Sequence, residues 1–149
     1  MRLQVDEHVA APPADVFRFV ATDHFRNHPT WDPAVVELTP TSAGPMGRGS
    51  TARLVRSERG RRIEGTVTVT GYEPDRTFAA VAEFGPFRLG QRAMCTPAPD
   101  GGTRLALTID TRASGPVRLL LPLMRRRFRR TMRESLRSIK RSVEAGASA

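Results

Sequence analysis

The sequence predicts an α+β fold in which one antiparallel sheet wraps a long terminal helix. Two observations predict it. Strand-like segments separated by tight turns follow one another between Ser50 and Arg112, and such short links join antiparallel neighbours. A helical repeat of apolar residues then runs from Val117 to Val143. Because a sheet that wraps one helix leaves space between the two, we place the function in that space.

Length and composition indicate one domain over residues 1–145, with a disordered tail at 146–149. The net charge of +9 is almost wholly due to arginine, since Lys140 is the only lysine. A lone cysteine, Cys95, excludes an intramolecular disulfide and a multi-cysteine metal site. The N-terminus is charged where a signal peptide is apolar, and the longest apolar run, 119–124, is too short to span a bilayer. We therefore expect a cytoplasmic protein.

The N-terminal segment predicts one strand and two short helices. Leu3 to Ala10 is the strand, which Pro12 and Pro13 end. Ala14 to Ala21 follows as a helix, and Pro13 suits its first turn because the missing N–H has no partner there. Thr22-Asp23 can cap a second helix that runs through about His28. Two prolines, at 29 and 33, then restrict the chain around Trp31.

Extended segments make up the middle of the chain, at residues 34–38, 50–57, 63–72, 77–84, 88–96 and 104–112. Two of them alternate clearly enough to assign faces. One face carries Ile63, Val67 and Val69 on one strand, and Leu105, Leu107 and Ile109 on the other. We therefore expect one covered and one solvated sheet face, while the remaining strands do not reveal their orientation.

The terminal helix is predicted over Val117 to Val143, about 40 Å long. Pro122 either kinks it or marks a new first turn. Its apolar stripe consists of Val117, Leu121, Met124, Phe128, Met132, Ser135, Ile139 and Val143. The opposite side carries Arg126, Arg130, Arg133, Arg137 and Arg141.

Two groups of residues near the start of this helix are not explained by a single apolar stripe. The run Arg125 to Arg130 is most simply a solvated face, and an RNA, ribosomal or anionic membrane partner is the less expected interpretation. It lacks aromatic residues on which bases could stack. Leu119, Leu120 and Leu123 suit a cavity mouth, a dimer contact or a membrane-touching lip, but a partly buried helix start is the simplest account.

Six segments, in order along nearly the whole chain, resemble the START-like (SRPBCC) superfamily and its polyketide cyclase/dehydrase branch. They are Ala11-Pro12-Pro13-Ala14-Asp15-Val16-Phe17, Thr22 to Pro33, Gly47-Arg48-Gly49-Ser50, Tyr72-Glu73-Pro74-Asp75-Arg76, Gly101-Gly102-Thr103-Arg104-Leu105 and the terminal helix. The resemblance implies a helix-grip fold, with a seven-stranded antiparallel sheet around the C-terminal helix and two short helices after the first strand. It also implies the binding of hydrophobic small molecules, with catalysis in only some members.

The covered sheet face and the helix stripe predict the wall of a binding cavity. Its expected ligand-binding residues are Trp31, Leu54, Val67, Val69, Phe78, Phe84, Leu107, Ile109, Met124 and Phe128. The alternative is that these side chains meet and simply fill the core. Small strand residues favour open space, namely Gly65, Ala80, Ala82, Gly90 and Ala93.

Neither a metal site nor a cofactor is expected. His8, His24 and His28 lack the spacing of a zinc site and are interpreted as surface or capping residues. No nucleophile motif is present. Five polar strand residues have undetermined orientation and are expected mostly on the convex face: Glu83, Arg92, Gln91, Tyr72 and Arg56. Of these, Arg92 and Glu83 are weak catalytic candidates.

The leading functional hypothesis is binding of a hydrophobic or aromatic, lipid- or polyketide-like molecule. Trp31 and Phe128 would supply flat contacts, and Met124 adaptable ones. One alternative is a polyketide aromatase/cyclase, in which Arg92 or Glu83 assists enolisation. Another is an interaction module whose arginine-rich helix binds an anionic partner. The ligand's identity, and whether the protein is a monomer or a homodimer, stay open at this level.

Overall fold

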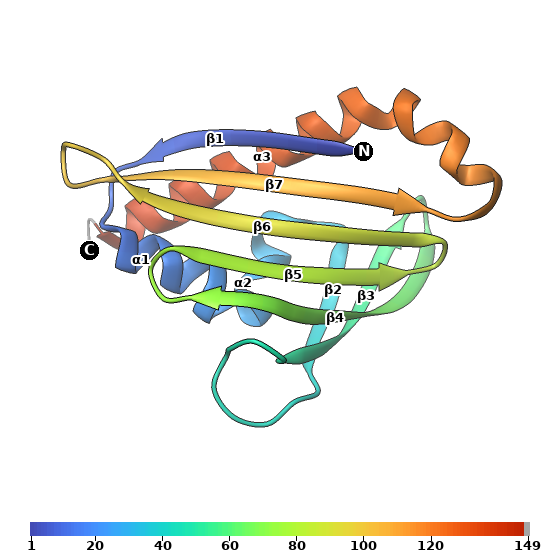
Figure 1. Cartoon of the computed structure of the whole chain (residues 1–149), viewed down its shortest axis with the longest axis horizontal. Coiled ribbons are helices and arrows are strands. Elements are labelled where there is room, and N and C mark those ends of the chain that lie inside the picture. The colour runs from blue at the N-terminus through green and yellow to red at the C-terminus, as the bar shows by residue number, and fades with distance from the viewer. Residues whose placement is uncertain (148–149) are drawn as a thin grey trace.

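A seven-stranded antiparallel sheet curves around the C-terminal helix in the structure, a computed structural model that describes residues 1–147 (Figure 1). The strand order across the sheet is β1-β7-β6-β5-β4-β3-β2. The strands are β1 (Arg2–Val9), β2 (Val35–Pro40), β3 (Thr51–Glu58), β4 (Arg61–Glu73), β5 (Thr77–Phe84), β6 (Phe87–Pro97) and β7 (Thr103–Ala113). Hairpins join β2 to β7 in sequence, and β1 closes the far edge by pairing with β7. The predicted fold class is confirmed.

The helical segment between β1 and β2 differs in detail from its prediction. It consists of α1 (Pro13–Phe17), a π-helical turn η1 (Arg18–Thr22) and α2 (His24–Trp31). The expected end near His28 is wrong because α2 continues through Pro29, and the Asp32 N–H still donates to the His28 carbonyl at 3.1 Å. Residues 24, 28 and 31 therefore share one helix face, and that face is turned inward.

Strand β4 keeps the predicted alternation and then shifts it. Val67 and Val69 are buried on the concave face. A bulge between Val69 and Gly71 changes the register with β5, and Tyr72 then pairs with Phe78. Tyr72 consequently contacts Phe17 edge-on, with ring centroids 5.3 Å apart. The expectation that Tyr72 lies on the convex face is wrong because this bulge re-aims it.

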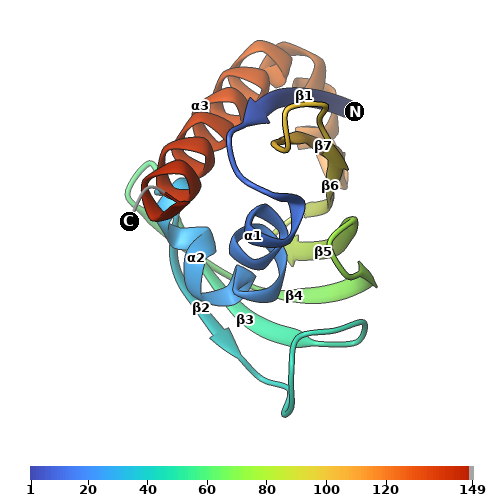
Figure 2. The same ribbon diagram turned by 90° about the vertical axis from the view of Figure 1, so that its left-hand side faces the viewer.

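The C-terminal helix α3 (Leu121–Ala147) follows a 3-10 turn, η2 (Gly115–Leu120). Pro122 thus lies in a new first turn, one of the two predicted alternatives. The helix includes residues 146 and 147 of the predicted tail, whereas 148 and 149 lie outside the described residues. Figure 2 shows α3 along the open side of the curved sheet, with α1 and α2 nearby. The Ser135 hydroxyl fastens α3 to α2 by donating to the Trp31 carbonyl at 3.0 Å.

The two sides of α3 follow the predicted stripe in part. Met132, Ile139 and Val143 are buried as predicted. Leu136, which the predicted stripe omitted, is also buried, and Val117 lies in η2 before the helix. The solvent side carries exposed arginines at 126, 130, 133, 137 and 141. Within residues 1–147, no helix combines the length and the apolar character that crossing a bilayer requires.

Candidate functional site

The space between the concave sheet face and α3 is not completely filled. It contains a cavity of about 160 Å³ whose wall comes from α2, from β3 to β7 and from α3. Most of the predicted ligand-binding residues line it, namely Trp31, Leu54, Val67, Phe78, Phe84, Leu107, Ile109 and Phe128. The other two do not: Val69 is fully buried in the core, and Met124 is half-buried one turn before Phe128. An open interior therefore exists where the fold predicted one.

Small residues create part of this space. Ala82 on β5 and Ala93 on β6 line the cavity, whereas Ala80, on the same face of β5, is packed into the core. Gly65 acts differently, because a Cβ there would collide with the Glu83 carbonyl and Phe84. Its role is to let β4 and β5 approach closely.

His24 and His28 lie in the interior, which overturns the expectation of surface or capping residues. His24 is 3% exposed, and its ring lies 4.8 Å from that of Phe78 and 4.7 Å from that of His28. Burial, reinforced by His28, lowers the pKa of His24 from 6.5 to about 3. The ring is therefore neutral at pH 7. Its Nδ1–H donates to the Val20 carbonyl at 2.9 Å, and its Nε2 is left as an acceptor 3.5 Å from the Gln91 amide.

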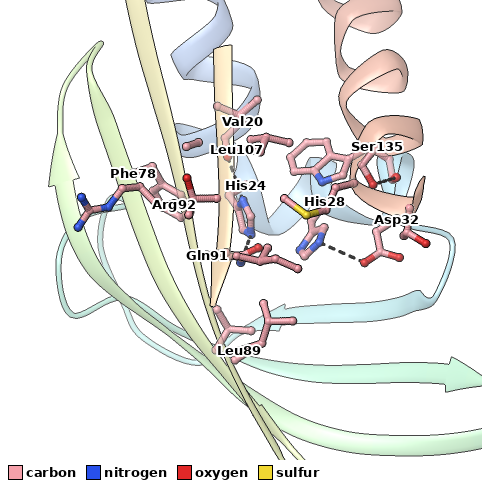
Figure 3. A pocket seen from close by; sticks show the side chains of 18 of the residues that line it. Val20, His24, His28, Asp32, Phe78, Leu89, Gln91, Arg92, Leu107 and Ser135 are labelled. Carbon is pink, nitrogen blue, oxygen red and sulfur yellow. Dashed lines mark hydrogen bonds and ion pairs between the residues drawn. The ribbon is translucent and has the colours of Figure 1, made fainter. Parts of the chain in front are cut away.

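A charged pair borders the cavity beside the histidines. Arg56 of β3 donates to Asp32 at 3.1 Å and to Glu58 at 2.9 Å. Burial alone would raise the pKa of Asp32, but His28 and Arg56 outweigh it and lower the pKa to about 2. The His28 Nε2 lies 3.7 Å from the Asp32 carboxylate, and its Nδ1 has no hydrogen-bond partner within residues 1–147. Figure 3 shows His28 between His24 and Asp32.

Two more of the undetermined polar residues thus face inward. Arg56 and Gln91 were expected on the convex face, but both line the cavity. Arg56 also lies over the Phe84 ring, 5.2 Å from its centroid. No sequence pattern predicts that Arg56 faces inward, because its burial depends on a carboxylate partner. That partner is Asp32, which follows α2 and lies 24 positions away in the chain.

The two weak catalytic candidates face the other way. Glu83 lies between the inward-facing Ala82 and Phe84, and its carboxylate pairs with Arg88 at 3.0 Å on the convex face. The Arg92 side chain is exposed, and Figure 3 shows it directed away from the cavity, although the residue forms part of the wall. Their position removes both side chains from acid–base chemistry inside the cavity.

Other reactive residues do not add a second centre. Among residues 1–147, no group of three His, Cys, Asp or Glu residues is arranged to hold a metal ion. His8 is on the surface and pairs with Asp100 at 2.9 Å. Burial, together with the charge of Asp75, raises the pKa of the Cys95 thiol to about 12, so it is not a nucleophile at neutral pH.

Comparison with known proteins agrees with this architecture. The chain is 18% identical to the ZhuI aromatase/cyclase from Streptomyces sp. R1128, with a TM-score of 0.75 over 97% of this chain and 93% of that one. It is 18% identical to the protein TTHA0849 from Thermus thermophilus, with a TM-score of 0.75 over 98% and 99%. It is 17% identical to a START superfamily protein from Mycobacterium smegmatis, with a TM-score of 0.70 over 97% and 94%.

No curated protein sequence matches the chain. The family model described as polyketide cyclase/dehydrase and lipid transport matches residues 1–144. A match of this extent, together with the seven-stranded sheet and the cavity under α3, decides the assignment. The chain belongs to the polyketide cyclase/dehydrase and lipid transport family.

Proposed function

We propose that the protein binds a hydrophobic or aromatic small molecule in the cavity between the sheet and α3. The observation that carries the proposal is the cavity itself, whose wall is mostly apolar and whose volume is about 160 Å³. A dry apolar cavity of about 150 Å³ accepts benzene. The space therefore suits one aromatic ring or a short alkyl segment.

A larger ligand has room to continue toward one side of the cavity. Leu89, Leu107, Ile109 and Phe128 line it and are only half-buried, in contrast to Leu54 and Phe78 on the deep side. We infer that the ligand's apolar end is enclosed between Leu54 and Phe78, with its remainder directed toward Phe128. This orientation fits lipid- and polyketide-like molecules better than compact polar ones.

The polar residues of the wall favour a ligand with one hydrogen-bonding group. Gln91 offers an amide, and Arg56 and Asp32 lie at the border of the cavity. The buried Nδ1 of His28, which no residue within 1–147 satisfies, supports a ligand hydroxyl or a water at this position. A hydroxylated aromatic molecule therefore matches the wall better than a pure hydrocarbon does.

Binding is better supported than cyclase catalysis. The residues expected to assist enolisation, Arg92 and Glu83, direct their side chains away from the cavity. The polar side chains that do face the cavity are the neutral His24, His28, Gln91 and the Arg56–Asp32 ion pair, and these groups suit holding and orienting a ligand.

The proposal is tested by mass spectrometry of compounds released from the purified protein, and by thermal unfolding with naphthols, flavonoids and fatty acids. A ligand at about a hundred times its Kd adds about 2.7 kcal/mol, which raises Tm by roughly 5–10 °C in a chain of this size. The variant Ala82→Leu occupies part of the cavity and should reduce this shift, while Val81→Leu, on the convex face of the same strand, should keep it. A protein that releases no compound and shows no shift would contradict the proposal.

A further inference from the structure

Three leucines around the start of α3 are strongly exposed. Leu119 and Leu120 of η2 are 72% and 50% exposed, and Leu123 of α3 is 81% exposed. The expected partly buried helix start is wrong because only Leu121 of this segment turns inward, at 8% exposure. We call Leu119, Leu120 and Leu123 the leucine lip. Exposed leucines of this size, three within five positions, are unusual on a surface that contacts only water.

Positive charge without any acidic counterpart surrounds the leucine lip. Arg118, Arg125, Arg126, Arg127 and Arg130 are exposed, and we call them the arginine collar. The sequence has no aspartate or glutamate between Asp110 and Glu134. Within residues 1–147 no carboxylate lies within ion-pair distance of any collar arginine, in contrast to Arg53, Arg62, Arg88 and Arg104 on the sheet. Collar charges are therefore available to an external anion.

We propose that the leucine lip and the arginine collar form a docking surface for a membrane that contains anionic lipids. Guanidinium groups pair with lipid phosphates, and each arginine near such a surface adds to the attraction. Leucine side chains that enter the interface add the hydrophobic part of the binding energy. Leu123, Arg126 and Arg130 share one side of the first turns of α3, so a single plane can contact the lip and most of the collar. Arg125 is directed toward β1, where it donates to the Arg2 carbonyl at 3.5 Å.

The shape of the lip favours a bilayer over other anionic partners. Figure 1 shows that the connection from β7 to α3, which contains η2, reaches beyond the strand ends. A flat surface can therefore approach this end of the molecule, where the lip leucines are exposed. A bilayer accepts protruding side chains without a complementary pocket, whereas a protein partner must supply one. RNA is disfavoured because the lip offers leucines and no aromatic ring on which bases stack.

The docked orientation places α3 at the membrane on the side where the cavity is less enclosed. Phe128, part of the cavity wall, follows Leu123 of the lip by five positions, which is about 7.5 Å along the helix axis. Docking would thus bring the half-buried end of the cavity toward the lipid. The docking proposal itself does not depend on a ligand.

The experiment is co-sedimentation of the full chain with two kinds of vesicle, one of phosphatidylcholine alone and one about one-third phosphatidylglycerol. We expect binding to the anionic vesicles that weakens as salt rises. Leu119→Ser with Leu123→Ser should lower it roughly tenfold or more. Arg126→Gln with Arg130→Gln should lower it and reduce its salt dependence. Matched controls are Arg137→Gln with Arg141→Gln at the far end of α3, and Val36→Ser on β2, which is 51% exposed.

Four outcomes would overturn the proposal. The first is equal failure to bind either vesicle, and the second is anionic-vesicle binding that the leucine variants leave unchanged. The third is a concentration-dependent dimer that the leucine variants abolish, with no vesicle binding, because the lip would then be a contact between two copies. The fourth is tighter binding to single-stranded RNA than to vesicles. Circular dichroism on each variant establishes that these surface substitutions leave the fold intact.

Discussion

Replacing Ala82 by leucine should make the protein more stable, which is unusual for a large side chain at a buried position. Ala82 is 6% exposed and lines the cavity of about 160 Å³. Leucine adds three carbon atoms, half as many as benzene, and a cavity of this size accepts benzene. Burying them contributes up to about 2.4 kcal/mol, from which the ordering of the side chain subtracts about 0.5–1 kcal/mol. The expected gain is about 1–2 kcal/mol.

Ala80 supplies the matched control because it lies two positions earlier on the same strand and the same face. It is 1% exposed and does not line the cavity. Ala80→Leu should therefore overpack the core and lower the stability by about 1–3 kcal/mol. Urea unfolding of both variants at neutral pH measures the two free-energy changes. If Ala82→Leu were as destabilising as Ala80→Leu, the reasoning would fail, since the space beside Ala82 would then be filled.

Three further predictions concern the residues around the cavity. Because burial lowers the pKa of His24 to about 3, the unfolded chain takes up a proton below pH 6.5 that the folded chain does not. Stability should therefore fall as the pH falls, with a loss of about 2 kcal/mol at about pH 5, as urea unfolding will show. Arg56→Met should cost about 3 kcal/mol in urea unfolding, because the Asp32 carboxylate loses its partner, and it should raise the pKa of Asp32 in an NMR titration. Gly65→Ala should cost about 2–3 kcal/mol in urea unfolding, since the new methyl overlaps the Glu83 carbonyl.

Each of these predictions has a control on the same molecule. His24→Phe should remove the pH-dependent loss, and an unchanged slope would show that another group causes it. Arg53→Met breaks an ion pair on the convex face, where the side chain is 44% exposed, and should cost less than about 1 kcal/mol. Gly47→Ala adds a methyl to open space and should be neutral. If Arg53→Met cost as much as Arg56→Met, the interior ion pair would have no special role.

Much of the fold could be predicted from sequence because its signals are local and periodic. Alternation on β4 and β7 identified the covered face, and the three- and four-residue steps of α3 identified its buried side. Turn residues marked the hairpins. Two predictions were wrong: the end of α2, which continues through Pro29, and the orientation of Tyr72, which the bulge at Gly71 changes. Residue propensities predict neither feature, because packing against the rest of the fold determines both.

The cavity wall, too, could be predicted only in part. Periodicity predicts its apolar residues. It does not predict the polar ones, because a histidine or an arginine is buried only when a partner from another part of the chain stabilises it. His24 depends on the Val20 carbonyl, and Arg56 depends on Asp32. The four- and three-residue spacing of His24, His28 and Trp31 could have indicated that the two histidines face the interior with Trp31. That inference requires a helix that extends to Trp31, and the sequence predicts an end near His28.

The central claim is that the gap between the sheet and α3 is an apolar binding space, and xenon tests it most directly. Crystals of the protein pressurised with xenon should show a bound atom between Phe78 and Phe128, because apolar cavity walls of this kind take up xenon and this side of the cavity is apolar. The Ala82→Leu variant should show reduced or no occupancy at this position. Wild-type crystals with no xenon there, and with side chains filling the gap, would contradict the account.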